Sequence, residues 1–301
     1  MTLLDLHVES IRACPILVVG ADGNIGRALS TELRRLGADL FETTRRIDSV
    51  GGQRLYLDLL MSEDKWELPE SIQVSFVCAG VTVLKECEQN PSNTSTVNVD
   101  NTLSLIRRLL DNGSSVIYLS TVAVVDGSSA FASDEVENQP SCEYSRQKAE
   151  VERTLLEWNE DRLAILRITK VLSPQMPLIN EWIRSLKSGV AIHPFSDLVI
   201  APVSLNYVVN SLIQIAASET YGMFQVTGDR DISYADAAIF IADKLGVDKE
   251  LVQPRISKEM GIDLMSNPSH ATLNANRIQK ELGIEPANVW VSISEAFSLY
   301  Q

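Results

Sequence analysis

The sequence is poor in the residue types that form disulfides and metal sites. Its 301 residues include only four cysteines and three histidines. The cysteines form no C-x-x-C pair and show no Cys/His spacing typical of zinc ligation, so we expect four reduced thiols. His7, His193 and His270 lie far apart in the chain. The sequence therefore predicts no metal site.

Positive charge and long apolar runs are also scarce. The chain has 26 Lys and Arg against 40 Asp and Glu, a formal net charge of −14. A field of this sign repels phosphate polymers and anionic lipids, so we expect neither nucleic acid nor a membrane as partner. Apolar runs such as 16–19 are much shorter than the ~20 residues of a membrane span. The first ten residues carry Asp5, His7 and Glu9 rather than a signal-peptide core, and we expect a soluble, cytoplasmic protein.

Through its first half the chain alternates short β-branched runs with amphipathic helical segments. This alternation is typical of a parallel sheet with helices on both faces. The expected strands are Pro15–Gly20, Asp39–Thr44, Arg54–Leu57, Val74–Cys78, Val116–Ser120 and Leu163–Ile168, and the expected helices are Ile25–Leu36, Thr96–Asp111 and Tyr144–Trp158. The pattern predicts an α/β fold with a doubly wound parallel sheet of the Rossmann type.

After about residue 172 the pattern becomes irregular, and prolines separate shorter elements. We therefore predict two domains: an NAD(P)-binding Rossmann domain over 1–172 and a smaller C-terminal substrate lobe over 173–301. Segments such as 198–218 are expected to pack back on the first domain.

A glycine-rich turn joins the first strand to the first helix. The stretch G-A-D-G-N-I-G places Gly20, Gly23 and Gly26 at this junction, with Asn24 and Ile25 between them. A pyrophosphate site needs a tight turn, close approach of the backbone and free amides at a helix start. The spacing differs by one residue from G-x-G-x-x-G, and an ordinary glycine-rich turn is the alternative. The position predicts that these five residues contact a dinucleotide.

The end of the second strand bears on the choice between NAD and NADP. An NAD site usually has Asp or Glu there to accept the ribose hydroxyls. This strand ends at Thr44 and is followed by Arg45 and Arg46. Arginine pairs bidentately with phosphate, so we expect these three residues to favour NADP, with NAD less likely. A solvated basic loop is the alternative.

Two further strand ends fall on the ligand-binding edge of such a sheet. Asp58 and Leu59 follow the third strand, and Cys78, Ala79 and Gly80 follow the fourth. Ligands of open α/β sheets bind outside the carboxyl ends of the strands. We expect these five residues to contact the cofactor, although a helix cap or a turn would explain them equally well.

The sequence also contains a candidate catalytic group. Tyr144 and Lys148 are spaced i, i+4 on a predicted helix and therefore share one face. A phenol with a pKa near ~10 can protonate a carbonyl oxygen, and a neighbouring ammonium group favours its phenolate. Thr121 follows Ser120 at the end of the fifth strand, where a hydroxyl can hold the carbonyl. We predict Thr121, Tyr144 and Lys148 as catalytic residues, with a chance surface pair as the alternative.

Taken together, these segments resemble the extended short-chain dehydrogenase/reductases, and most closely the dTDP-4-dehydrorhamnose reductase and NAD-dependent epimerase branch. The resemblance covers nearly the whole chain. The matching stretches are 20–26, 77–80, 85–88 with Pro91, 98–99, 119–121, 126–127, 144–150, 166–174, 202–204 and 221–234.

The resemblance implies a role for particular residues. Thr121 is the hydroxyl member, Tyr144 the acid/base and Lys148 a ribose contact, so Tyr144 and Lys148 also bind the cofactor. Asn98 supports the cofactor site. Substrate contacts are expected from Val81, Arg167 and Lys170.

The implied activity is NADP(H)-dependent reduction of a keto group on a nucleotide-activated sugar. Val122 and Ala123 follow the threonine where the reductases have Asp-Tyr and the dehydratases Asp-Glu. This chain therefore lacks the acid and base that a 4,6-dehydratase needs. The identity of the sugar is not predicted. The alternatives are an NAD-dependent nucleotide-sugar epimerase and a non-catalytic NADP-binding sensor or regulatory subunit. A homodimer through the helices 96–111 and 144–158 is expected by analogy with relatives.

Overall fold

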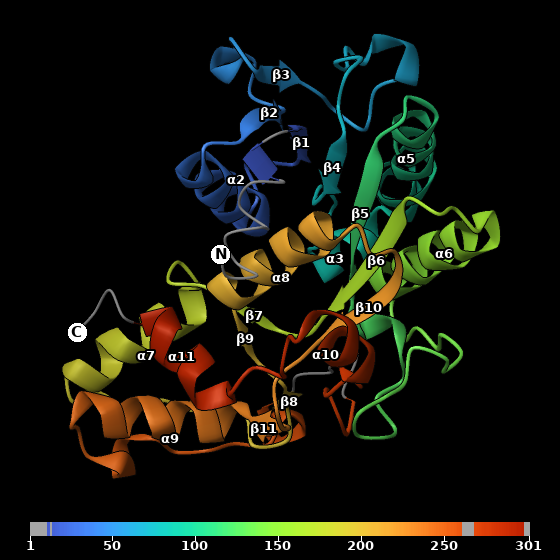
Figure 1. Ribbon diagram of the computed structural model, residues 1–301. Coiled ribbons are helices and arrows are strands. Elements are labelled where there is room, and N and C mark those ends of the chain that lie inside the picture. Colours follow the sequence, from blue (N-terminus) through green and yellow to red (C-terminus); the bar gives the residue numbers. More distant parts are fainter. Residues whose placement is uncertain (1–10, 13, 261–267, 298–301) are drawn as a thin grey trace. The chain divides into compact units, whose positions relative to one another are not determined.

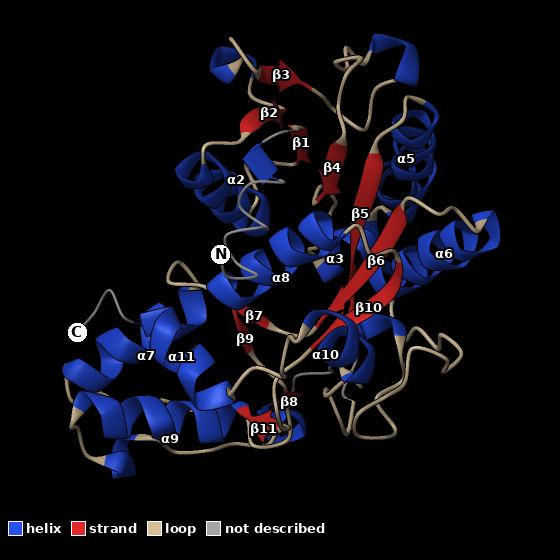
Figure 2. Ribbon diagram, in the orientation of Figure 1, coloured by secondary structure: helices blue, strands red, loops and turns tan. Residues whose placement is uncertain are grey.

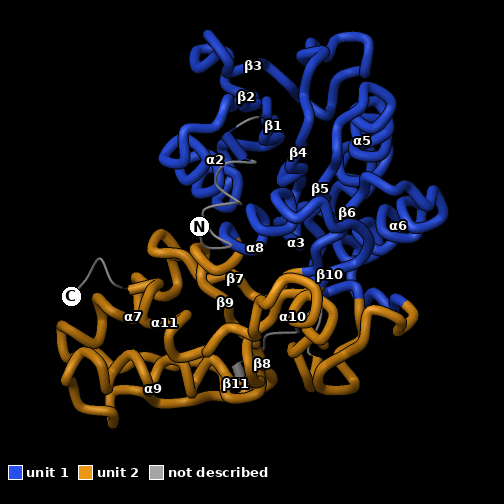
Figure 3. Tube along the Cα trace, in the orientation of Figure 1, with its two compact units in different colours: residues 1–124, 138–167, 209–224 blue, residues 125–137, 168–208, 225–301 orange. Residues whose placement is uncertain are grey.

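The computed structural model describes residues 11–12, 14–260 and 268–297 (Figure 1). The first ten residues, which entered the prediction about a signal peptide, lie outside this part. The chain divides into two compact units (Figure 3). Unit 1 comprises Met1–Val124, Asn138–Arg167 and Val209–Phe224, and unit 2 comprises Val125–Glu137, Ile168–Val208 and Gln225–Gln301. The units are thus discontinuous in sequence, and the division into a cofactor domain and a substrate lobe at residue 172 stays a prediction.

The central sheet has seven strands in the order β10-β6-β5-β4-β1-β2-β3. Their bounds are β1 (Pro15–Val19), β2 (Asp39–Thr44), β3 (Arg54–Tyr56), β4 (Val74–Val77), β5 (Ser115–Thr121), β6 (Leu163–Ile168) and β10 (Gly222–Val226). β1 pairs in parallel with both β2 and β4, and the order reverses between β1 and β4. This reversal is the topological switch point at which such sheets bind ligands. The predicted fold class is confirmed.

Local sequence explains why the first strand and helix form. β1 is apolar throughout, as expected for a parallel strand covered on both faces. The helix α2 (Asn24–Leu36) buries Leu29, Leu33 and Leu36 on one face and ends at Gly37, which has a left-handed φ of 81°. α2 contacts β1 and β2, while α5 (Asn101–Asp111) and α6 (Glu143–Trp158) contact β5. Figure 2 shows α2 on one face of the sheet and α5 and α6 on the other.

The helical region before β5 differs from the prediction. Two helices come before the predicted start, α3 (Leu84–Gln89) and α4 (Pro91–Ser95), and the predicted helix opens with a π-helical turn, η3 (Thr96–Asp100). The early start follows from Pro91, which is favoured in the first turn of a helix. The sequence between Pro91 and Ser95 is polar, so apolar periodicity could not indicate it.

Unit 2 has a core of its own around α7 (Pro177–Lys187), α9 (Tyr234–Leu245) and α11 (Val289–Phe297). Its other regular elements are β7 (Val171–Leu172), β8 (Val199–Ile200), β9 (Val203–Ser204), β11 (Ile232–Ser233) and α10 (Asn276–Leu282), and α8 (Leu205–Ser218) leads back into unit 1. Within the described ranges, none of the helices has the length and apolar character needed to cross a bilayer.

Candidate active site

The glycine turn after β1 is closely packed by backbone. Gly20 has a φ of 85°, and a Cβ at this position would lie 2.7 Å from the backbone nitrogen of Ala79. A Cβ on Gly26 would overlap the carbonyl oxygen of Gly20. Gly23 caps α2 without any side-chain hydrogen bond. The first turn of a helix has amides without helical acceptors, so this turn is suited to hold an anion.

The turn is fixed in place by β2 and by α2. The Gly20 amide donates to Thr43 Oγ1 at 3.0 Å, and the Ala21 amide donates to the Thr43 carbonyl at 3.2 Å. Arg27 donates from Nη2 to the carbonyl of Asp22 at 2.7 Å. The turn is therefore shaped by the protein itself, and Thr43, which the sequence reasoning had not selected, is its main anchor.

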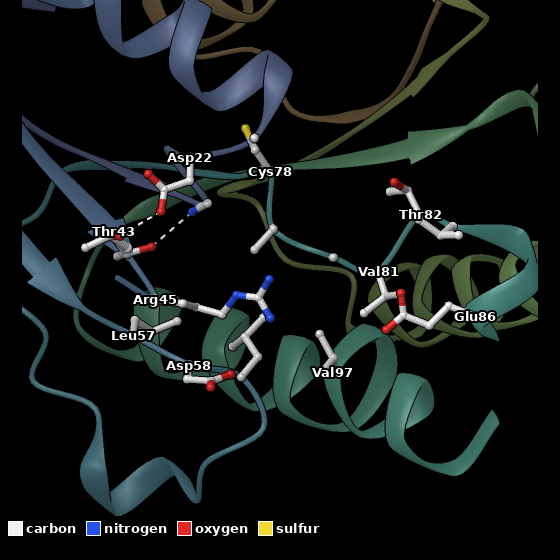
Figure 4. Close-up of a pocket in the computed structure, with 17 residues that line it drawn as sticks. Asp22, Thr43, Arg45, Leu57, Asp58, Cys78, Val81, Thr82, Glu86 and Val97 are labelled. Carbon is white, nitrogen blue, oxygen red and sulfur yellow. Dashed lines mark hydrogen bonds between the residues drawn. The ribbon is translucent and has the colours of Figure 1, made fainter. Parts of the chain in front are cut away.

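A cavity of about 300 Å³ lies at this turn (Figure 4). The predicted residues that line it are Gly20, Gly23, Thr44, Arg45, Asp58, Leu59, Cys78, Ala79, Gly80 and Val81; those that line it without having been predicted are Asp22, Thr43, Leu57, Thr82, Val83, Glu86 and Val97. Asn24, Ile25 and Gly26 form the first turn of α2 instead, and Arg46 lies outside the lining. Asp22, Thr43, Leu57, Thr82 and Val97 each adjoin a predicted residue in the chain, which was the signal for them, whereas Val83 and Glu86 adjoin none.

The residues of this cavity fit an adenine dinucleotide. The glycine turn at the start of α2 provides a backbone site for pyrophosphate. Figure 4 shows the Arg45 side chain extending over the cavity, near Asp58. Asp58 also accepts the Leu60 amide at 3.0 Å, so it closes the turn after β3 as well as lining the cavity. Burial raises the pKa of the Cys78 thiol to about 12, so this thiol stays protonated and unreactive at neutral pH.

Asn98 holds the segment that follows β4. Its Oδ1 accepts the Val81 amide at 2.7 Å, and its Nδ2 donates to the Val81 carbonyl at 3.0 Å. The second hydrogen of Nδ2 goes to Gln147 Oε1 at 2.8 Å. Asn98 lies in the π-helical turn, a distortion that often occurs at functional sites. It thus acts on the cavity through Val81, and the predicted substrate contact of Val81 stays a prediction.

The structure brings Tyr144 and Thr121 together. Tyr144 lies in the first turn of α6, Thr121 is the last residue of β5, and their side chains share a hydrogen bond. Burial raises the pKa of Tyr144 to about 12, and the hydrogen bond to Thr121 opposes this rise. The Tyr144 phenol is therefore neutral at physiological pH and able to donate a proton.

Lys148 is buried one turn further along α6. Its Nζ donates to the Tyr118 hydroxyl at 3.0 Å and to the Leu119 carbonyl at 2.8 Å, and lies 4.4 Å from the centre of the Tyr118 ring. Burial lowers the pKa of Lys148 to about 8, while the charges of Glu152 and Cys78 oppose this shift. Lys148 itself is not among the residues that line the cavity. Tyr118 had not been predicted.

Arg167, a predicted substrate contact, lies in a buried ion pair. Its side chain is buried at the end of β6 and donates to Glu152 from Nη2 at 2.7 Å and from Nε at 3.0 Å. Nη2 also donates to Asn138 Oδ1 at 2.7 Å. Nε and Nη2 are thus taken by an internal ion pair and by Asn138, whereas Nη1 is buried without a hydrogen-bond partner among the described residues. The predicted substrate contact of Arg167 stays a prediction. Lys170 belongs to unit 2, and its predicted contact stays a prediction.

The chain is similar to known proteins over most of its length. A curated dTDP-4-dehydrorhamnose reductase from Aggregatibacter actinomycetemcomitans is 26% identical over 287 residues, covering 91% of this chain and 95% of that protein. The crystal structure of a dTDP-4-dehydrorhamnose reductase from Clostridium acetobutylicum matches with a TM-score of 0.81 at 20% identity, over 95% of this chain and 99% of the other. The Bacillus anthracis dTDP-4-dehydrorhamnose reductase in complex with NADP matches with a TM-score of 0.80 at 17% identity, over 96% and 99% of the two chains. The family model described as the RmlD substrate binding domain matches residues 14–301, and this chain belongs to that family.

Proposed function

We propose that this chain is an NADP(H)-dependent reductase of the extended short-chain dehydrogenase/reductase type, acting on a keto group of a nucleotide-activated sugar. The observation that carries the proposal is the neutral phenol of Tyr144, hydrogen-bonded to Thr121 and one helical turn from the buried ammonium of Lys148. The glycine turn and its cavity add a site for the dinucleotide. The names of the relatives support the substrate class, and the NADP complex of one relative supports the cofactor.

The chemistry assigned to the residues is a balanced ketone reduction. A reduced nicotinamide, when bound, would supply the hydride for the carbonyl carbon. Thr121 holds the carbonyl oxygen, and Tyr144 transfers its proton to that oxygen. The product is an alcohol, and the phenolate that remains is stabilised by the Lys148 ammonium until it takes a proton from solvent. A phenol pKa of about 12 favours this direction, because the reaction starts from the protonated form.

Cofactor contacts are proposed for the remaining predicted residues around the cavity and the start of α2. Val81, Arg167 and Lys170 are proposed as substrate contacts, and for Arg167 the group that would make the contact is Nη1, which the ion pair with Glu152 leaves without a partner in the described part of the chain. A cytoplasmic location fits the four free cysteines, and a homodimer through α5 and α6 belongs to the same proposal.

The test is calorimetric titration of the purified chain with NADPH, followed by an assay of NADPH oxidation with a dTDP-linked 4-keto sugar. Tyr144→Phe removes the proton donor and should lower kcat by about 10²- to 10⁴-fold while leaving the Kd of NADPH within about twofold. If a cofactor-free preparation bound neither NADPH nor NADH, the proposal would fail. Full activity of Tyr144→Phe would exclude the assigned role of Tyr144, whereas NADPH binding by the parent chain without any turnover would favour the non-catalytic alternative.

The epimerase alternative predicts a different result. An epimerase keeps its nicotinamide through the catalytic cycle, so the purified chain would retain bound NAD and would interconvert two nucleotide sugars without net consumption of NADPH. Release of the cofactor by acid, followed by its identification, separates these two functions before any substrate is known.

A further inference from the structure

A carboxylate lies at the end of β2 although β2 does not provide one. The sequence there reads Thr44-Arg45-Arg46, which predicted a site for a 2′-phosphate. In the structure, Thr44 Oγ1 donates to Asp22 Oδ2 at 2.6 Å. Asp22 belongs to the glycine turn and lines the cavity (Figure 4). A different element therefore supplies the acidic group that an NAD site usually takes from β2.

The nearby Arg54 is not available to a phosphate. Arg54 Nη2 pairs with Asp22 Oδ1 at 2.5 Å, and its Nη1 pairs with Glu42 Oε2 at 3.2 Å. Glu42 and Arg54 face each other in the parallel pairing of β2 with β3, and Glu42 also pairs with Arg34. Arg54 is thus held between two carboxylates and its charge is largely balanced. Of the cations at this end of the sheet, Arg45 is the one that lines the cavity within the described residues.

Asp22 and Arg45 select for opposite forms of the cofactor. The ribose 2′-hydroxyl of NADH is a donor, and a carboxylate is a good acceptor for it. A 2′-phosphate carries nearly two negative charges at neutral pH, so it is attracted by Arg45 and repelled by Asp22. The preference between the cofactors then depends on the balance of these two side chains.

We propose that Asp22 is a specificity-determining residue that accepts the ribose hydroxyl of NADH and thereby limits the preference of this chain for NADPH. The inference rests on the proposed function, since it requires a nicotinamide dinucleotide in the cavity. The sequence interpretation of the cofactor preference rested on Thr44, Arg45 and Arg46 and did not include Asp22.

The test is the ratio of two dissociation constants, Kd(NADH)/Kd(NADPH), measured by calorimetry without substrate. Asp22→Asn removes the negative charge and keeps an oxygen that can accept from Thr44. We expect this variant to raise the ratio about tenfold, equivalent to ~1.4 kcal/mol. Asp39→Asn is the matched control, because Asp39 is the exposed first residue of β2 and loses the same charge at the opposite end of that strand. Its ratio should stay within about twofold of the parent.

A second substitution separates charge from positioning. Thr44 Oγ1 also accepts the Arg46 amide at 2.9 Å, so the Asp22 hydrogen bond helps to orient the turn that carries Arg45. Asp22→Ala removes both the charge and the hydrogen bond. If Asp22→Ala changed the ratio and Asp22→Asn did not, Asp22 would act by positioning and the proposal would be overturned.

The outcomes also distinguish this inference from the proposed function. If the parent chain binds neither cofactor, the proposed function fails. If it binds at least one and Asp22→Asn leaves the ratio unchanged, only the role of Asp22 fails. Should Asp22→Asn not fold, Arg54→Met gives the opposite test. It removes the cation paired with Asp22 and leaves Glu42 with Arg34, and it should lower the ratio; an unchanged or higher ratio would refute the proposal.

Discussion

The burial of Lys148 predicts a particular dependence of stability on pH. The pKa of Lys148 is lowered from 10.5 to about 8, mainly by burial. The folded state therefore binds this proton less tightly than the unfolded state does. Below about pH 8 Lys148 is protonated in both states, and the burial of its ammonium group lowers the free energy of unfolding by the full amount. Between about pH 8 and 10.5 the unfolded state holds more protons, so the free energy of unfolding rises with pH.

The size of this effect follows from the difference in pKa. A difference of about 2.5 corresponds to roughly 3 kcal/mol, at ~1.36 kcal/mol for each pH unit. Lys148→Met removes the titrating group and keeps an unbranched side chain. The parent should therefore gain roughly 3 kcal/mol relative to Lys148→Met as the pH is raised from 8 to 10.5. Other groups titrate in both proteins, and their contributions cancel in the comparison.

Urea unfolding at several pH values across this window measures the effect. Lys65→Met is a suitable control, since Lys65 is an exposed lysine of unit 1. The free energy of unfolding of the Lys65→Met variant should change with pH in parallel with that of the parent. The reasoning is refuted if the Lys148→Met curve is also parallel to the parent curve between pH 8 and 10.5, because Lys148 would then titrate alike in the folded and unfolded states.

Three further predictions concern the framework of the site. Gly26→Ala should abolish NADPH binding and cost about 1–3 kcal/mol of stability, because its Cβ would overlap the Gly20 carbonyl; calorimetry and urea unfolding measure both. Arg167→Met should cost about 3–5 kcal/mol in urea unfolding, since it leaves the Glu152 carboxylate buried without its partner, and Glu152→Leu in the same chain should recover most of that loss. Gln147→Leu removes the partner of Asn98 and should weaken NADPH binding more than it lowers kcat, a split that general destabilisation would not produce.

Sequence patterns predicted the fold because it depends on local regularities. The apolar strand Pro15–Val19 and the glycine turn after it are consecutive in the chain, so a strand, a turn and a helix could be recognised together. The spacing of Tyr144 and Lys148 predicts a shared helix face for the same reason. The π-helical turn around Asn98 was missed because apolar periodicity does not distinguish a π turn from an α turn.

Contacts between distant segments could not be predicted in this way. Thr43 anchors the glycine turn across 23 positions of sequence, and Gln147 reaches Asn98 across 49. Tyr118 meets Lys148 across 30 positions. Each depends on which strands pair and which helix covers them. Asp22 was overlooked because the usual acidic residue belongs to β2, and only the packing of the glycine turn against Thr44 brings this carboxylate there.

The ion pair between Arg167 and Glu152 explains why Glu152 does not balance the positive charge of Lys148. Tyr144, Lys148 and Glu152 succeed one another at intervals of four residues along α6, so they lie on one face. Glu152 supports the charge of Lys148 through space, but its oxygens are taken by Arg167 and Asn138. The Lys148 ammonium is therefore left with the neutral acceptors Tyr118 and Leu119. The pair Arg167–Glu152 is neutral as a whole, so the net positive charge of this buried group is that of Lys148. That charge is placed one turn from the phenol that must become negative, which explains why a cost in stability is retained at this position.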